Sequence, residues 1–137
     1  MTDLGVPRGF SNSAADGINN NGQVVGYCWN QENARHAFVY SGGWTDLGLL
    51  PGFQSSLGYG INNNGQVVGY CQNSYGATSA FLYNGNTIMD LNSLIPSNLG
   101  WRLKYAFAIN DNGQIAGQGT SPSGQTHAFL GSSGMFR

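Results

Sequence analysis

The chain has 137 residues, of which 40% are hydrophobic and 8% are charged, with a formal net charge of −1. This length predicts one domain, with a core that needs no metal ion or disulfide to fold. Five Lys and Arg residues are too few for a nucleic-acid surface, and no run reaches the roughly 18 apolar residues of a membrane span. Met1–Gly5 lacks the pattern of a signal peptide, and the composition assigns no compartment.

Glycine and asparagine are abundant, with 22 and 16 copies, whereas Lys, Glu and Ala are scarce. Such residues favour turns and short strands over helices. No segment shows a sustained period of 3.6 residues with helix caps, so we expect little helix.

An eleven-residue block recurs along the chain. Gly17–Tyr27 and Gly60–Tyr70 both read GINNNGQVVGY, and Ala108–Gln118 matches six of these eleven positions. An Ala-Phe pair follows each block at a fixed distance, and an Asp-Leu pair precedes each block, with an insert between them in the third unit. These recurrences predict a single repeat domain of three tandem units, at about residues 2–44, 45–88 and 89–136.

Each unit is predicted to form four short antiparallel strands. In the second unit we expect these strands at Trp44–Gly48, Ser55–Asn62, Gln66–Cys71 and Ala80–Tyr83. The Asn-Asn-Asn-Gly segment predicts a tight hairpin, because Asn tolerates left-handed backbone angles and Gly adopts them freely. Residues 93–100 form an insert that has room for one short helical turn.

A glycine lies inside the third strand of each unit, at Gly26, Gly69 and Gly117. Glycine inside a strand indicates a bulge or the close approach of another backbone.

We therefore predict an all-β fold of three tandem four-stranded units that close into a ring. Units of this size are typical of β-propeller blades. Three blades are too few to surround an axis, so the preferred form has six blades from two chains. In that form Thr2–Gly5 of each chain pairs with the last strand of the other and removes two exposed edges. A β-trefoil, with three four-stranded units in one chain, is the alternative fold.

The triplets at His36–Phe38 and His127–Phe129, together with the blocks Gly17–Tyr27 and Gly60–Tyr70, resemble the HAF repeat family. The resemblance covers all three units. It implies an extracellular repeat protein of unknown function with a variable number of units, and it implies no catalytic residues.

Residues with catalytic potential recur with the units, which favours structural roles. The two histidines share one unit position, and the third occupant of that position is Ser79. Three recurring aspartates are expected to accept backbone N–H bonds in turns, namely Asp3, Asp46 and Asp90. Cys28 and Cys71 form neither a zinc set nor a disulfide framework, so we expect free thiols.

Motifs for catalysis and for ions are missing from the sequence. It contains no GxSxG nucleophile turn and no phosphate-binding glycine motif. Asp111 is the one carboxylate across the three copies of the Asn-rich turn, which is too few for calcium. We predict no enzyme, no metal site and no cofactor.

Aromatic and amide residues outside the recurring core positions indicate a ligand site. They lie in loops around Trp29–Asn33 and Gln72–Tyr75, and Tyr105 is a further aromatic residue of this kind. An aromatic ring packs on an apolar ligand face while amides fix its orientation. The candidate ligand-binding residues are Trp29, Asn30, Arg35, Asn73 and Tyr75.

We predict a non-enzymatic binding or interaction scaffold with carbohydrate as the favoured ligand class. The alternative is a purely structural surface repeat protein that self-associates, and an enzyme of unrecognised type is a distant third. The expected partners are a second copy, joined by strand pairing of the chain ends, and a glycan or peptide. Nucleic acid and a membrane span are not expected.

Overall fold

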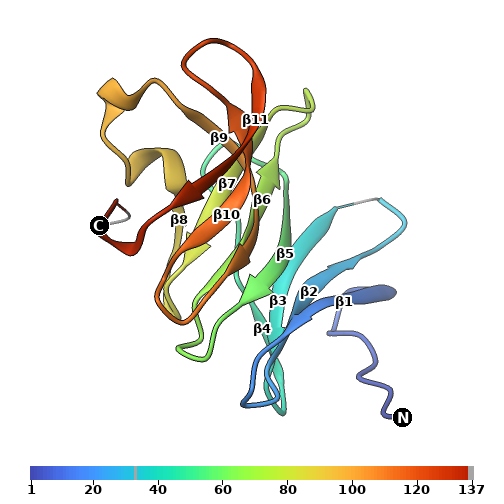
Figure 1. Cartoon of the computed structure of the whole chain (residues 1–137). Helices are drawn as coiled ribbons and strands as arrows, with labels where there is room; N and C mark the ends of the chain where they lie inside the picture. The colour runs from blue at the N-terminus through green and yellow to red at the C-terminus, as the bar shows by residue number, and fades with distance from the viewer. Residues whose placement is uncertain (33, 136–137) are drawn as a thin grey trace.

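A computed structural model describes residues 1–32 and 34–135, and it is built from three antiparallel sheets (Figure 1). The first sheet contains β1 (Asn12–Ile18), β2 (Val24–Trp29), β3 (Arg35–Tyr40) and β4 (Trp44–Asp46). The second contains β5 (Ser55–Ile61), β6 (Val67–Gln72), β7 (Thr78–Tyr83) and β8 (Ile88–Asp90). The third contains β9 (Arg102–Ile109), β10 (Ile115–Thr120) and β11 (Thr126–Gly131).

The remaining elements are three short 3-10 turns, η1 (Leu91–Ser93), η2 (Ser97–Leu99) and η3 (Ser133–Met135). The prediction of an all-β fold with little helix is confirmed. The predicted strands of the second unit are found with ends shifted by one or two residues, but the first of them, β4, pairs with β3 in the first sheet. Contrary to the prediction, the units therefore do not form sheets of their own, because the first strand of the second and of the third unit completes the preceding sheet. The insert at 93–100 contains η2, as expected.

The Asn-rich turns join the first two strands of each sheet. In the second sheet, Gly65 adopts a φ of 78°, and its N–H donates to Asn62 O at 3.1 Å. The side-chain Oδ1 of Asn62 also accepts from the N–H groups of Asn64 and Gln66. Asn and Gly therefore close the hairpin by the mechanism that the sequence predicts.

The glycine predicted in the third strand of each unit lies on β2, β6 and β10, and it lets two backbones approach closely. A Cβ added to Gly69 would overlap the carbonyl oxygen of Leu57 and lie 2.8 Å from the ring of Phe81. The register between β5 and β6 shifts beside this point, between Gly58 and Gly60. The predicted close approach and bulge are both confirmed.

The sheets pack face to face in chain order. β5 contacts β1, β2 and β3 of the first sheet, and β9 contacts β5, β6 and β7 of the second. Figure 1 accordingly shows the second sheet between the other two. Each contact contains one apolar cluster, built around Val25 and Phe81 in the first case and around Val68 and Ile115 in the second.

Two parts of the fold prediction need correction. The third sheet has three strands among the described residues, not four, because no strand pairs with the outer edge of β11. Thr2–Gly5 forms no strand, so the described chain does not close into a ring on itself. Phe136, the expected start of a fourth strand, and Asn33 lie outside the described residues.

Candidate functional site

A polar hollow of about 270 Å³ lies where loops of the first and second sheets meet. It is lined by Glu32 and Arg35 from the first sheet and by five residues from the second, Gln54, Ser55, Gln72, Asn73 and Ser74. Two hydrogen bonds shape it: Arg35 N–H donates to Ser55 Oγ at 3.4 Å, and Ser74 N–H donates to Gln54 Oε1 at 2.7 Å. The hollow thus presents amides, hydroxyls, one guanidinium and one carboxylate.

Arg35 is held in this hollow by aromatic neighbours. Its guanidinium carbon lies 5.8 Å from the centre of the Tyr27 ring, in cation–π geometry. Tyr27 in turn lies 5.3 Å from the ring of Trp29, which pairs with Arg35 across β2 and β3. Arg35 Nε is buried and has no hydrogen-bond acceptor among the described residues. Arg35 also lines the hollow, so its guanidinium is placed to donate to an acceptor on a ligand there.

The structure brings together two of the five predicted site residues, Arg35 and Asn73, in the polar hollow. Trp29 lies behind Arg35 and does not line the hollow. Asn30 accepts from Glu32 N–H at 3.1 Å, so its carbonyl closes the loop that carries Glu32. Tyr75 is 95% exposed at a loop tip and lies outside the hollow.

The sequence reasoning missed Gln54, because it reaches the hollow from the loop before β5, and it gave Gln72 only as the start of a ligand loop and not as a candidate residue. It also missed a row of packed rings on the second and third sheets, formed by Tyr59, Tyr70, Tyr105 and Phe107. One signal was available, since Tyr59 and Phe107 both stand two residues before the isoleucine of the recurring block.

Tyr59 links this aromatic row to the first sheet. Burial raises the pKa of Tyr59 well above its usual range, with further contributions from Tyr70, Asp16 and Tyr27. Burial also raises the pKa of Asp16, which stands at the equivalent sequence position. The row thus offers ring faces, of which Phe107 is 46% exposed.

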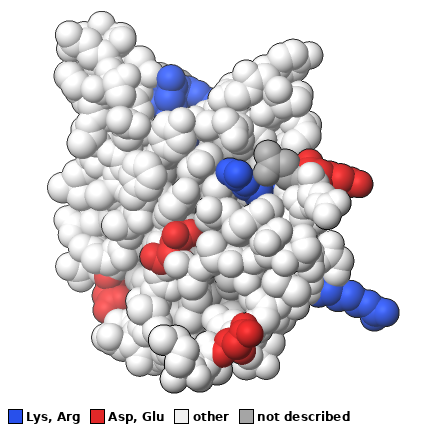
Figure 2. Space-filling view, turned by 90° about the vertical axis from the view of Figure 1, so that its right-hand side faces the viewer, with Lys and Arg blue, Asp and Glu red and all other residues white. Residues whose placement is uncertain are grey.

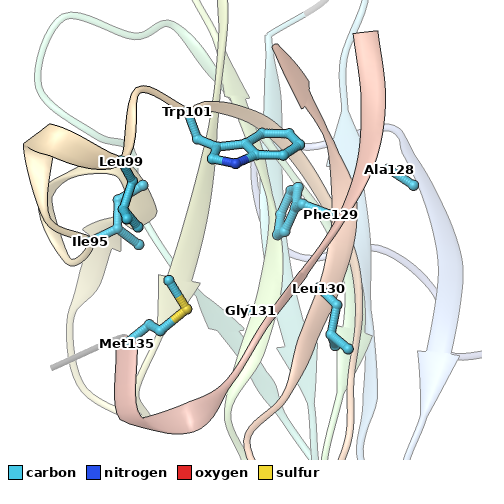
Figure 3. Close-up of a pocket in the computed structure, with 8 residues that line it drawn as sticks. All are labelled: Ile95, Leu99, Trp101, Ala128, Phe129, Leu130, Gly131 and Met135. Atoms are coloured by element: carbon cyan, nitrogen blue, oxygen red, sulfur yellow. The ribbon is translucent and has the colours of Figure 1, made fainter. Parts of the chain in front are cut away.

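An apolar hollow of about 330 Å³ lies beside β11 (Figure 3). Trp101 and Phe129 lie on one side of it and face Ile95, Leu99 and Met135. Ala128 and Leu130 point away from those rings because side chains alternate along a strand, as Figure 3 shows. The described residues that line this hollow are mostly apolar, which suits packing against an apolar group.

The recurring polar residues have structural partners. His36 Nδ1 lies 2.8 Å from Asp46 Oδ2, and Ser79 Oγ donates to Asp90 Oδ1 at 2.8 Å. Each aspartate also accepts the backbone N–H two residues later, as does Asp3. The predicted turn role of the aspartates is therefore confirmed, and histidine and serine complete it from the neighbouring strand.

Both cysteines are buried, free thiols, as expected. Burial raises the pKa of Cys28 to about 11, with help from the carboxylate of Asp46, and burial raises the pKa of Cys71 to about 11. At neutral pH both are neutral and therefore weak nucleophiles.

Charged groups are sparse on the surface. Figure 2 shows a few scattered basic and acidic side chains on an otherwise uncharged face. Within residues 1–32 and 34–135, no cluster of three or more His, Cys, Asp or Glu side chains could hold a metal ion. In the same described part, no helix is long and apolar enough to cross a membrane.

Comparison with known proteins gives one family. No curated protein and no solved structure matches the chain. The match is instead to a family model described as protein of unknown function (DUF3466), over residues 3–129. The expected membership of the HAF repeat family is therefore wrong, because the short triplet and turn block that suggested it do not identify a family by themselves. With nearly its whole length matched, the chain belongs to the DUF3466 family, whose function is unknown.

Proposed function

We propose that this protein is a non-enzymatic binding module that holds a carbohydrate in the polar hollow between the first and second sheets. The observation that carries the proposal is the Arg35 guanidinium, which is held over the Tyr27 ring beside the amides of Gln54, Gln72 and Asn73. Sugar hydroxyls are both donors and acceptors, so they match a lining of amides, hydroxyls and a guanidinium.

The surroundings of Arg35 support a binding role over a catalytic one. The stack of Trp29, Tyr27 and Arg35 fixes the guanidinium before a ligand arrives, which lowers the entropy lost on binding. Glu32 is the one carboxylate in the hollow lining, whereas glycoside hydrolysis normally needs a pair of them. A short polar peptide is the second ligand class that this lining would accept.

A glycan array tests the proposal with wild-type protein and two variants. Arg35→Gln removes the guanidinium and should abolish binding of any glycan retained by the wild type. Tyr75→Ala is the matched control, because the exposed Tyr75 side chain lies outside the hollow although it is on the loop that carries Asn73 and Ser74. Retained glycan binding by Arg35→Gln, or no binding by the wild type, would contradict the carbohydrate site.

A second candidate function is structural self-association. It is favoured by the outer edge of β11, which has no partner strand among the described residues. Unpaired edges recruit strands from other chains unless they are covered. In this form the protein would be a six-bladed, propeller-like pair of chains that acts as a surface scaffold. Light scattering of purified protein separates a self-associating chain from a monomer.

A further inference from the structure

The three sheets stack in chain order, and the two faces of a sheet have different partners. The second sheet packs one face against the first sheet and the other face against the third. Val25 on the first sheet and Val68 on the second are fully buried against the following sheet. On the second and third sheets, Ile61 and Ile109 are both 9% exposed in the contact with the preceding sheet. The contact between the first and second sheets and the contact between the second and third sheets therefore use equivalent residues.

The two outer faces of the array carry the same residues without a partner. Ile18 stands where Ile61 and Ile109 stand, yet it is 69% exposed on the first sheet. On the third sheet Ala116 stands where Val25 and Val68 stand, and it is exposed. Leu130, also on the outer face, is 70% exposed, whereas its equivalent Leu82 is buried. Each outer face is thus one half of the contact seen inside the chain.

The Asn-rich turns show the same directional pattern in hydrogen bonds. Asn19 Nδ2 donates to Asn62 O at 2.9 Å, and Asn62 Nδ2 donates to Asn110 O at 3.0 Å. Asn110 Nδ2 donates to Gln114 within its own turn and has no such bond to a further turn in the described structure. This series of hydrogen bonds between turns therefore ends at the third sheet with the donor Asn110 Nδ2. It begins at the first sheet with the acceptor Asn19 O.

The edge of the third sheet and the N-terminal segment are also complementary. Asp46 follows β3 and pairs with His36, and Asp90 ends β8 and pairs with Ser79. His127 on β11 is the exposed equivalent of His36, and Asp3 lies in the segment Thr2–Gly5, which belongs to no sheet. The leucines after Asp46 and Asp90 are buried, at Leu47 and Leu91, whereas Leu4 is only half-buried.

We propose that a second copy of this chain docks head to tail on the third sheet. Its first sheet covers Ala116 and Leu130, and its Thr2–Gly5 pairs with β11 as the missing fourth strand. Asp3 of the second copy then meets His127, and its Leu4 enters the contact between the sheets. The inference rests on the self-association proposed above and specifies the surface that produces it.

Two copies related in this way should form a closed ring. A head-to-tail contact gives either a ring or an open filament, depending on the rotation between copies. Two chains of three sheets give six, within the range of four to eight that surrounds an axis. The near-zero net charge of the chain imposes little long-range repulsion on the pair.

Sedimentation equilibrium of the full chain at micromolar concentration tests this surface. The wild type should sediment as a dimer. Ile18→Asp and Leu130→Asp each place a carboxylate in one half of the contact and should sediment as monomers. Tyr75→Asp adds the same charge at another exposed large side chain, outside both faces, and should remain a dimer. Because Ile18 and Leu130 are exposed in the single chain, both variants should keep the wild-type circular dichroism spectrum.

Mixing the two monomeric variants gives the decisive measurement. An Ile18→Asp chain keeps an intact third-sheet face, and a Leu130→Asp chain keeps an intact first-sheet face. The mixture should therefore regain 1:1 dimers through one intact contact, although both aspartates then fall at the second contact and the ring stays open there. A contact between two identical faces could not be restored in this way. A wild-type dimer that persists in both variants would overturn this surface while leaving self-association in place. A wild-type monomer up to 100-fold higher concentration would overturn both proposals.

Discussion

The turn residue Asn62 gives a quantitative test of how neighbouring sheets are joined. It is buried, and its amide makes all the hydrogen bonds that an asparagine side chain commonly makes. Nδ2 donates to Gln66 Oε1 at 2.7 Å and to Asn110 O at 3.0 Å. Oδ1 accepts from the N–H groups of Asn64 at 3.1 Å and Gln66 at 2.9 Å. Asn62→Ala removes all of these bonds, including the one that reaches the third sheet.

Asn110→Ala is the matched control, because Asn110 has the same place in an equivalent but exposed turn. Its side chain bonds only within the turn, donating to Gln114 Oε1 at 2.7 Å and accepting from Gln114 N–H at 2.9 Å. Its backbone oxygen would still accept from Asn62 in this variant. With about 1 kcal/mol net per hydrogen bond, Asn62→Ala should lower the free energy of unfolding by about 4 kcal/mol and Asn110→Ala by about 2 kcal/mol.

Urea denaturation followed by tryptophan fluorescence measures both values, and the linear extrapolation resolves a difference of about 2 kcal/mol. The larger loss for Asn62→Ala follows from two bonds that Asn110 lacks among the described residues, one to the third sheet and one from Asn64 N–H, and from the burial of the groups left unpaired. Equal losses in the two variants would refute the idea that this turn holds the second and third sheets together.

Three further outcomes are expected. Gly69→Ala should lower the free energy of unfolding in urea by at least about 3 kcal/mol, because overpacking alone costs about 1–3 kcal/mol and the added methyl group also meets backbone. Gly43→Ala is the control, because a methyl group added there has no neighbouring atom within 4 Å. Cys28 and Cys71 should react with a thiol reagent at pH 8 only after unfolding, and fast labelling of the native protein would contradict their burial. Because their native pKa of about 11 exceeds that of unfolded thiols, near 8.5, the native state retains protons that the unfolded state loses. Stability in urea should therefore fall from about pH 8.5 to pH 11, and replacing both cysteines with serine should flatten that decline.

Sequence reasoning located part of the candidate site. Arg35 and Asn73 do meet in the polar hollow, because each lies beside a loop at the same end of its sheet. Tyr75 does not join them, since a residue at a loop tip can point away from the groove that its neighbours line. Gln54 was not predicted, because its approach to Arg35 and Asn73 depends on how two sheets pack and not on any local pattern.

The sequence by itself determined the local structure of this protein. Strand positions, Asn-Gly turns and the close approach at Gly69 depend on backbone preferences within short segments, so the residues specify them directly. Only the tertiary structure decided which faces are covered. Ile18 and Ile61 occur in identical sequence blocks, yet one is exposed and the other is buried, because burial depends on whether a neighbouring sheet is present.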